Sequence, residues 1–457
     1  MSPLSSNIYF PALDTIQKDM NTTTELVNLT VTVYMIFQGL SPSLWGSLAD
    51  IWGRRPVYLA TLLVYVGSCV GLGLTPNFTA LLILRMLQAC GSSSVIAIGA
   101  GVVGDIAAPS ERGGYFGIFS LGQMLGLVIG PVLGGIIAEY LTWRWIFWIL
   151  LIIGACFLAS IFFLLPETLR SLVGNGSGYA NPTPAQWWQR RKAKKCSHLQ
   201  IDGDGKKSKS RFLQIPNLSQ PFLFLLEKDV IVALIYNGIH YATYYCYLTS
   251  TTSQFTKIYS LSEIHIGLCF LCQGVGCILG SYFQGKLLDH NFKTTAIKSG
   301  FGEARRGNLP PNFPIFRARL RSLWINVIPI QVITLLYGWM LHIRAPLAVV
   351  LMLQFFMGAA STSMMNVFQT LVVDLFPSKS ASITATNNFV RCLLGATATV
   401  TIEPGIRGVG VGWIFTIVGL ICIVSNLLII VLLKFGNQWR QERMARLAKT
   451  VDRDAQS

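Results

Sequence analysis

The chain has 457 residues, of which 52% are hydrophobic and only 12% are charged. This composition excludes an ordinary soluble domain and is typical of a membrane protein. A formal net charge of +16 would favour nucleic acid as the partner of a soluble basic domain. Here the charges avoid the long apolar runs and gather in a few polar segments, as a membrane topology requires. We therefore expect the lipid bilayer, and no nucleic acid, as a partner.

Apolar runs of about 20 residues predict membrane-spanning helices. The first segment, 1–16, is apolar and aromatic, but at about 1.5 Å per residue it reaches only about 24 Å, less than a hydrocarbon core of about 30 Å. We interpret it as a first helix that is cut short, with the missing part upstream. Eleven complete spans follow, at 26–48, 56–75, 79–105, 114–140, 143–165, 229–255, 263–288, 322–343, 345–376, 380–403 and 411–435.

Basic residues predict the orientation of these spans. With both termini in the cytoplasm, the inner loops and the tail hold 29 of the 36 Lys and Arg, and the outer segments hold five. The remaining two, Arg85 and Arg391, fall inside spans. This bias is a strong positive-inside signal. We expect a multi-pass protein of the plasma membrane, or of another cellular membrane, with both ends in the cytoplasm.

The loop after the second span reads GSLADIWGRRP and carries a cluster of charges. A helix end and a tight turn at Gly53 place Asp50, Arg54 and Arg55 at the inner membrane edge, where guanidinium groups bridge helix ends. The loop resembles the G-x-x-x-D-x-x-G-R-R signature of the major facilitator superfamily. That resemblance implies that Asp50, Arg54 and Asp105 form a charge latch, which holds one conformation and breaks in the other. The alternative is that the two arginines only fix the topology.

The fourth span contains an arginine near its start. Arg85 and Gln88 resemble a motif that the superfamily carries on this helix, although Ala89 stands where glycine is more frequent. An arginine inside a membrane is costly and is therefore a functional candidate. The resemblance assigns Arg85 and Gln88 to coupling. The alternative is an arginine that snorkels to the membrane surface.

The end of the same span, GAGVVGD at 99–105, matches the G-x-G-x-x-G of dinucleotide-binding folds. That motif requires a strand before it, a helix after it and an acid about 20 residues further on. Here the preceding apolar run is too long for a strand, the following residues break a helix, and the acid is missing. We interpret these glycines as a face for close helix packing and expect no nucleotide.

The fifth span, GQMLGLVIGPVLGG, has glycines at four-residue spacing, which permit close helix approach, and a proline that bends the helix. It resembles the G-P-x-x-G-G antiporter motif of proton-coupled exporters, which uptake carriers of the superfamily generally lack. The resemblance implies a coupling role for Gly126, Gly130, Pro131, Gly134 and Gly135. Ordinary packing is the alternative. The eighth span, with Gly276 and Gly280, offers a matching smooth face.

A polar segment divides the spans into six and six. Residues 166–228 are rich in turn formers and basic residues and have no apolar period. We interpret them as a flexible cytoplasmic linker between an N-terminal bundle, 1–165, and a C-terminal bundle, 229–435, which a cytoplasmic tail, 436–457, follows. The linker and a second basic loop, 289–321, are candidates for contact with anionic lipid, although a solvated linker is the simpler interpretation.

The two halves repeat short motifs. GSLAD at 46–50 matches GKLLD at 285–289, and Asp105 in VVGDIAAPS matches Asp374 in VVDLFPS. These matches fall in corresponding spans, so they predict two homologous six-helix bundles in an all-α fold. A second Gly-Arg-Arg loop, which sugar porters have, is absent after Asp289.

The seventh span offers polar and aromatic side chains near the middle of the membrane. The residues at helical spacing on one face are Asn237, His240, Tyr241 and Tyr244. Such a face suits amphipathic organic cargo through stacking and cation-π contacts. His240 is also a hypothetical proton carrier, because imidazole titrates near neutral pH. Packing around a satisfied histidine is the alternative.

Arg391 lies near mid-depth of the eleventh span, where it would bind an anionic group of the cargo or pair with a carboxylate. Carboxylates are nearly absent at this depth, since Asp14 and Glu403 fall near the outer ends. Lesser candidates for the cargo site are Gln123, Asn366, Gln369 and Asn387.

Over residues 7–435, the chain resembles fungal twelve-span drug:proton antiporters of the quinidine-resistance and dityrosine-exporter kind. The resemblance implies a monomer that exports small amphipathic organic compounds or drugs in exchange for protons, by alternating access. Two alternatives remain: a narrow exporter of one metabolite, such as dityrosine, another amino-acid-derived compound or a polyamine, and a nontransporting receptor on the same fold. We predict no enzyme, cofactor or metal, because no nucleophile with its base and no ligand set is evident. The spacing of Cys269 and Cys272 is explained by packing.

Overall fold

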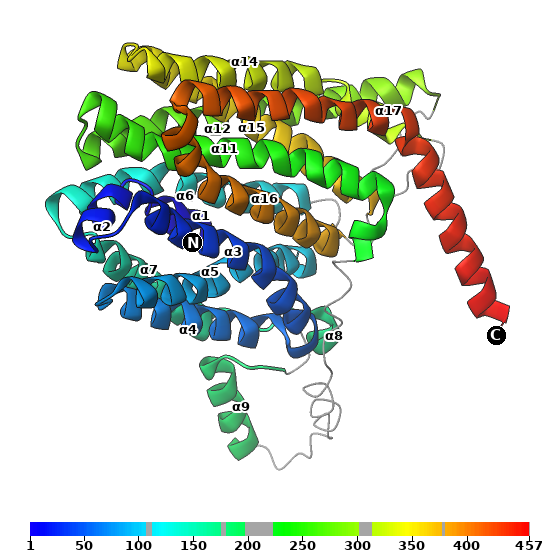
Figure 1. The fold of residues 1–457 in the computed structure, drawn as a ribbon. Coiled ribbons are helices and arrows are strands. Elements are labelled where there is room, and N and C mark those ends of the chain that lie inside the picture. Colours follow the sequence, from blue (N-terminus) through cyan, green and yellow to red (C-terminus); the bar gives the residue numbers. More distant parts are fainter. Residues whose placement is uncertain (107–111, 175–179, 197–222, 301–312, 377–379, 457) are drawn as a thin grey trace.

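The computed structural model shows a protein built from helices (Figure 1). It describes residues 1–106, 112–174, 180–196, 223–300, 313–376 and 380–456. Across these ranges every regular element is a helix, as the sequence predicts.

The first half of the chain begins with two short helices and continues with five long ones. They are α1 (Ser2–Asn7), α2 (Leu13–Asp19), α3 (Thr24–Trp52), α4 (Arg54–Gly73), α5 (Phe78–Ile106), α6 (Arg112–Tyr140) and α7 (Arg144–Leu164). Within the predicted linker, α8 (Arg170–Val173) and α9 (Pro184–Cys196) are helical.

The second half opens with a single turn of 3-10 helix, η2 (Phe224–Leu226). Its other helices are α11 (Lys228–Tyr259), α12 (Glu263–Lys298), α13 (Ile315–Leu320), α14 (Leu323–His342), α15 (Leu347–Leu375), α16 (Ser380–Val409) and α17 (Val411–Gln456).

The long helices form two groups that run side by side (Figure 1). One group has α14 and α17 at its outer edge, and the other has α4 and α7 at the opposite edge. Between the groups, α16 packs against α3 and α12 packs against α6. The two-bundle fold class is therefore confirmed.

The start of the chain differs from the single short helix that the sequence predicts. Helix α1 ends at Asn7, and a turn leads to α2. Pro11 lies in that turn, where it cannot supply the backbone donor that a continuous helix requires. The turn carries Ile8, Tyr9 and Phe10, each at most 1% exposed, into the core.

Seven helices of the described residues are both long and apolar enough to cross a membrane: α4, α5, α7, α12, α14, α15 and α17. Helices α3, α11 and α16 have 29, 32 and 30 residues, but their composition is more polar. Many of these polar side chains are buried, among them Asn28, Asn237 and Asn387. These side chains lower the mean hydropathy of α3, α11 and α16. Because they face other helices and not lipid, they are compatible with the predicted membrane spans.

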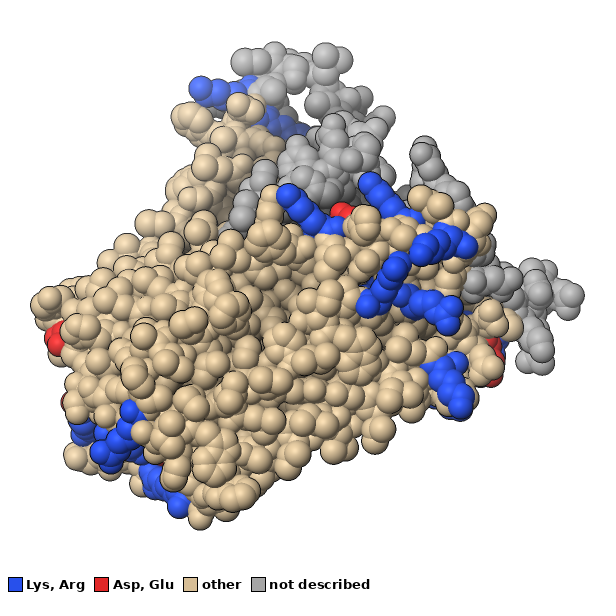
Figure 2. All heavy atoms as spheres, turned by 90° about the horizontal axis from the view of Figure 1, so that it is seen from above, with Lys and Arg blue, Asp and Glu red and all other residues tan. Residues whose placement is uncertain are grey.

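In Figure 2, the charged side chains on the near face of the molecule gather towards two opposite ends, and a further group lies in the more distant part at the upper edge. A broad band without Lys, Arg, Asp or Glu separates the charged groups at its two edges. Such a band fits the hydrocarbon layer of a bilayer. We call the rim that contains Arg54 the inner rim, because the sequence predicts that it faces the cytoplasm, and the opposite one the outer rim.

Candidate functional site

The charged loop between α3 and α4 turns at a glycine. Gly53 has a φ of +110°, in the region that favours glycine, and a Cβ atom there would lie 2.6 Å from the side-chain nitrogen of Asn181. Asn181 donates to the Trp52 carbonyl at 3.0 Å and to Glu167 at 2.8 Å. Glu167 accepts the backbone N–H of Arg54 at 2.8 Å, at a helix N-terminus, where a carboxylate is favourable. Residues after α7 therefore fix the predicted turn.

Arg54 is the centre of the first ion-pair site, which we define as Arg54, Asp50 and Asp105. Its Nε lies 3.0 Å from Asp105, and its Nη1 lies 2.7 Å from Asp50. A Cβ atom at Gly101 would lie 2.8 Å from the guanidinium carbon of Arg54. This glycine of GAGVVGD therefore permits close packing, as predicted. The three charges belong to α3, α4 and α5 of one bundle, and their role as a latch stays a prediction.

Arg55 does more than add a positive charge to the loop. It is 7% exposed, and its guanidinium donates to the carbonyls of Phe162, Asn181 and Pro182 at 2.7, 3.1 and 2.8 Å. The side chain thus joins the end of α7 to the start of the predicted linker.

A second ion-pair site, Arg319 with Asp374, occupies the equivalent place in the other bundle. Arg319 Nε donates to Asp374 at 2.7 Å, and the guanidinium lies 4.5 Å from the ring centre of Phe292. The sequence motif misses this arginine, because it comes 30 residues after Asp289, on α13, and not directly after the helix. The match between Asp105 and Asp374 was the available signal, since it implied an arginine partner for both.

The predicted tail also contributes to the inner rim. Arg443 of α17 lies 2.6 Å from both carboxylate oxygens of Asp229, at the start of α11. Arg440 donates to the Phe313 carbonyl at 3.0 Å, and both arginines are buried. We call Arg443 and Asp229 the α17 clasp. No sequence motif identifies it, because the two partners are 214 residues apart.

At the outer rim, polar contacts join the two bundles. Arg407 of α16 lies 2.7 Å from Glu25 of α3, and Thr15 of α2 donates to Glu263 of α12 at 2.6 Å. The described ion pairs of Arg54 stay within one bundle, whereas these contacts link both. The structure therefore holds the bundles together at the rim opposite to the predicted latch.

The glycine face of α6 receives another helix directly. Cβ atoms at Gly126 and Gly130 would lie 3.0 and 3.1 Å from backbone nitrogens of Leu4 and Ile8. Gly134 meets the Ile8 carbonyl, while a Cβ atom at Gly135 would lie 2.5 Å from the Glu263 carbonyl of α12. The predicted close packing is confirmed. Helix α1 and the turn after it pack on one side of α6, and α12 of the other bundle packs on an adjacent side. The coupling role of this motif stays a prediction.

Gly276 and Gly280 of α12, which were expected to form a face that matches the glycines of α6, pack against a different helix. Gly276 and Gly280 meet the carbonyls of Phe355 and Ala359 in α15, within the same bundle. A Cβ atom at Gly267 would instead lie 2.7 Å from the Pro131 carbonyl of α6. Gly267 and Gly276 are nine residues apart, which at about 100° per residue places them on opposite sides of α12. The sequence does not show which glycine face meets which neighbour.

Arg85 is buried between two tyrosine rings. It is 1% exposed, and its guanidinium carbon lies 4.0 Å from the ring centre of Tyr9 and 4.3 Å from that of Tyr34. Its Nη1 donates to Gln88 at 2.7 Å, while its Nε is buried without a hydrogen-bond partner. The snorkelling alternative is therefore wrong, and the predicted pair of Arg85 with Gln88 is formed.

Arg391 has similar surroundings in the other bundle. Its guanidinium lies 4.6 Å from the ring centre of Tyr241, donates to Asn388 at 3.0 Å and keeps a buried Nε without a partner. A Cβ atom at Gly395, one turn further on, would lie 2.5 Å from Met35 of α3. Arg391 is thus close to the contact between the bundles. In the described residues, neither Arg85 nor Arg391 forms an ion pair.

The polar residues of α11 do not share one environment. Tyr241 and Tyr244 contact Tyr245, with ring centres 4.7 and 6.0 Å apart. His240 instead packs on Tyr236 at 4.5 Å, and its Nδ1 lies 3.0 Å from that residue's carbonyl oxygen. His240 therefore contacts its own helix, whereas Tyr241 contacts Arg391, and the role of His240 in cargo or proton binding stays a prediction.

The remaining predicted cargo residues are mostly occupied with one another. Asn237 donates to Asn387 at 2.9 Å, and Asn387 donates to Gln369 at 2.8 Å. Asn366 donates to Ser281 at 2.8 Å, and Gln123 is half-exposed on α6. Asn237, Asn387 and Gln369 therefore form a chain of hydrogen bonds that joins α11, α16 and α15.

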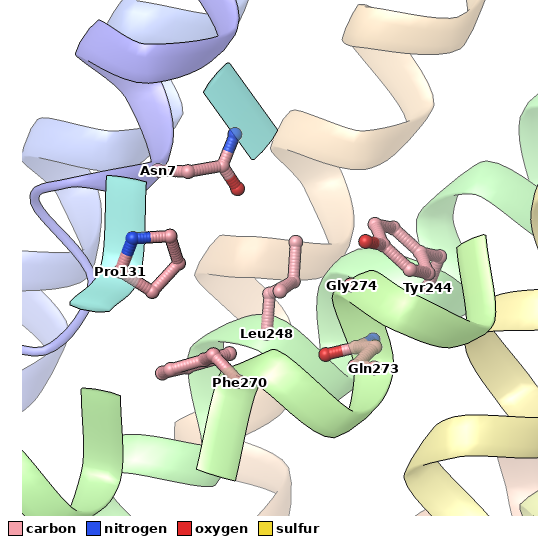
Figure 3. Close-up of a pocket in the computed structure, with 7 residues that line it drawn as sticks. All are labelled: Asn7, Pro131, Tyr244, Leu248, Phe270, Gln273 and Gly274. Atoms are coloured by element: carbon pink, nitrogen blue, oxygen red, sulfur yellow. The ribbon is translucent and has the colours of Figure 1, made fainter. Parts of the chain in front are cut away.

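A small pocket lies between the bundles (Figure 3). Its walls are Asn7 of α1, Pro131 of α6, Leu248 and Tyr244 of α11, and Phe270, Gln273 and Gly274 of α12. Sequence reasoning missed Gln273, which carries no motif. No group of three or more His, Cys, Asp or Glu that would suit a metal occurs in the part of the chain that the structure describes.

Comparison with known proteins agrees with this architecture. The family model described as Major Facilitator Superfamily matches residues 1–399. The human organic anion transporter MFSD10 (TETRAN) has a similar structure, with a TM-score of 0.57 over 94% of this chain and 96% of that one. At 17% identity, this likeness shows the fold alone.

Several fungal proteins are similar over nearly the whole chain. Citrate exporter 1 of Aspergillus niger is 42% identical over 453 residues, which cover 98% of this chain and 85% of that protein. Multidrug transporter QDR2 of Candida glabrata is 34% identical, with 96% and 78% covered, and quinidine resistance protein 1 of Saccharomyces cerevisiae is 33% identical, with 99% and 84% covered. The chain is a multi-pass membrane transporter, not an enzyme, and it belongs to the major facilitator superfamily, in the fungal group that contains these exporters.

Proposed function

We propose that this transporter exports small amphipathic organic compounds in exchange for protons, and that its preferred cargo is an organic anion. One observation supports a negative charge on the cargo. Arg85 and Arg391 come from different bundles, lie on tyrosine rings and have no ion-pair partner in the described structure. Arg85 is 1% exposed and Arg391 is half-buried, and a cation without a counter-charge is costly in such surroundings. Carboxylates of the cargo would supply that counter-charge from both sides.

The similarity to a protein named citrate exporter supports this charge preference. An arginine from each bundle also fits alternating access, since an anion held by both would draw the bundles together around it. Proton coupling is supported by the α6 motif alone. His240 is a candidate for the proton site, and the described contacts of its imidazole are with Tyr236 of its own helix.

A second candidate cargo is an uncharged amphipathic drug. The tyrosine rings around both arginines favour it, as does the similarity to multidrug transporter QDR2 and quinidine resistance protein 1. A polyamine is disfavoured, because two arginines repel a cation. The membership of a transporter family favours transport over the receptor alternative. A narrow exporter of one anionic metabolite, dityrosine included, fits the site as well as a broad one.

Citrate efflux from loaded vesicles tests the charge preference. We expect Arg85→Gln and Arg391→Gln each to slow efflux at least tenfold, since each removes a charge-assisted contact of about 1.5–3 kcal/mol. Arg321→Gln removes an exposed arginine and serves as the control. Unchanged citrate efflux in both variants would show that the arginines do not bind the cargo. Efflux of uncharged drugs with no efflux of anions would favour the second candidate.

A further inference from the structure

The pocket between the bundles contains an amide without a partner. Gln273 is 1% exposed, and both its Oε1 and its Nε2 are buried without a hydrogen-bond partner. Among the Asn and Gln side chains that the structure describes, Gln273 is the one whose oxygen and nitrogen are both buried without a hydrogen-bond partner. Unpaired buried polar atoms lower stability, so a native one requires an explanation.

Close packing fixes the position of this residue. A Cβ atom at Gly358 of α15 would lie 3.2 Å from Cγ of Gln273, so the two helices touch there. On the next residue, a Cβ atom at Gly274 would lie 3.0 Å from Val128 of α6. Gln273 therefore sits where α12 contacts both its own bundle and the other one.

The amide faces a pocket with room for about one water-sized group. Pro131, Leu248 and Phe270 form apolar walls, and Asn7 and Tyr244 add polar atoms (Figure 3). No charged side chain lines the pocket. A neutral hydrogen-bonding group fits this environment, whereas a carboxylate would lack a counter-charge there.

Tyrosine rings connect the pocket with Arg391. Tyr244 lines the pocket and lies 6.0 Å from Tyr245, ring centre to ring centre. Tyr245 lies 4.7 Å from Tyr241, whose ring carries the Arg391 guanidinium at 4.6 Å. The three rings form a continuous aromatic row between the pocket and the Arg391 guanidinium.

We propose that Gln273 binds a hydroxyl group of the cargo and so makes the transporter select hydroxylated organic acids. The amide offers one acceptor and two donor hydrogens, and a hydroxyl group both donates and accepts. This inference rests on the proposed function, in which the arginines bind the carboxylates. It adds a contact that distinguishes acids of the same charge.

Matched pairs of acids test the inference. Citrate and tricarballylate carry the same three carboxylates, but only citrate has a hydroxyl group, and malate differs from succinate in the same way. Binding of all four is measured by calorimetry on the purified full chain. We expect wild type to prefer one or both hydroxylated acids by about tenfold, the value of one net hydrogen bond. In Gln273→Leu this ratio should fall to about one, because the hydroxylated acid binds more weakly.

Gln284→Leu is the matched control, because Gln284 is a buried amide of the same helix that bonds to Asn326 and not to the pocket. It should keep the wild-type ratio. Thermal unfolding without cargo separates binding from structure: Gln273→Leu should unfold no earlier than wild type, since it removes an unpaired amide.

Two results would overturn the inference. They are equal binding of both members of each pair by wild type, and a ratio that persists in Gln273→Leu, whether or not that variant loses stability. If the acids bind equally well and the arginine variants still abolish binding, the proposed function stands without the Gln273 contact. If no acid binds to wild type, the anion preference and the Gln273 contact both fail.

Discussion

The two ion-pair sites of the inner rim have the same chemistry but different surroundings. In the first, the side chain of Asp50 is 64% exposed, and Arg54 follows a glycine turn. In the second, the side chain of Arg319 is fully buried, and α13, which carries it, packs against α17. Water stabilises the separated charges of an exposed pair but not those of a buried one. We therefore expect the Asp50–Arg54 contact of the first site to break and re-form during transport, and the second site to remain closed.

The largest effect is expected at the α17 clasp, beside the second site. Arg443→Ala leaves the fully buried Asp229 without its partner, which should cost about 3–5 kcal/mol of unfolding free energy. Thermal unfolding in detergent measures the loss. Arg446→Ala, whose side chain is 68% exposed, is the control and should cost less than about 1 kcal/mol. Equal losses in both variants would contradict the buried clasp.

The next largest loss of stability is expected at Arg319, and its size relative to the loss at Arg54 compares the two ion-pair sites directly. Arg319→Gln removes the fully buried guanidinium that contacts the carboxylate of Asp374 and should cost about 3 kcal/mol. Arg54→Gln should cost about 2 kcal/mol, because its contact with Asp50 is exposed to water, while its contact with Asp105 is mostly buried. The same unfolding assay compares them. If Arg54→Gln proves the more destabilising of the two, the proposed division between a moving site and a static one is wrong.

The glycine turn provides a smaller effect. Gly53→Ala forces a side chain into a positive φ and against Asn181, which should cost about 1–3 kcal/mol. Gly46→Ala, in the same motif but inside α3, has nothing within 4 Å of the added carbon and should stabilise the protein by about 0.5–1 kcal/mol, because alanine favours a helix interior over glycine. Similar unfolding temperatures for the two variants would show that the turn tolerates a side chain.

The smallest effect on stability is expected at Asp50. Asp50→Asn should leave the unfolding free energy within about 0.5 kcal/mol, since its carboxylate is mostly exposed. If the first site is the latch, the same variant should nevertheless slow transport severalfold. Vesicle efflux and thermal unfolding, measured on one preparation, check both parts. Full transport activity would remove Asp50 from the latch.

Much of the fold and the first ion-pair site follows from the sequence. Apolar runs locate the long helices because lipid requires them, and the spacing of Asp50, Gly53 and Arg54 is local, so a short motif contains all the information. The second ion-pair site could not be predicted from a short motif, because an insertion separates Arg319 from Asp289. The α17 clasp is not predicted either, since Asp229 begins the second bundle and Arg443 lies 214 residues later, in the predicted tail.

The centre of the molecule is the hardest part to predict. Arg85 and Arg391 are visible in the sequence because charges are rare in apolar runs, but their tyrosine partners come from other helices or from the turn after α1. His240 shows the converse problem: helical spacing places it near Tyr241, yet a small rotation decides which neighbour it meets. Gln273 has no sequence signal, because only the folded structure shows that its amide is unpaired.

The most direct test of the central claim is citrate efflux from vesicles that contain the purified full chain, with an acidic medium outside. We predict that citrate leaves faster as the medium becomes more acidic, that protons enter at the same time, and that Arg391→Gln stops both movements. Retention of citrate under this gradient, while an uncharged amphipathic drug leaves, would contradict an anion exporter with one arginine in each bundle.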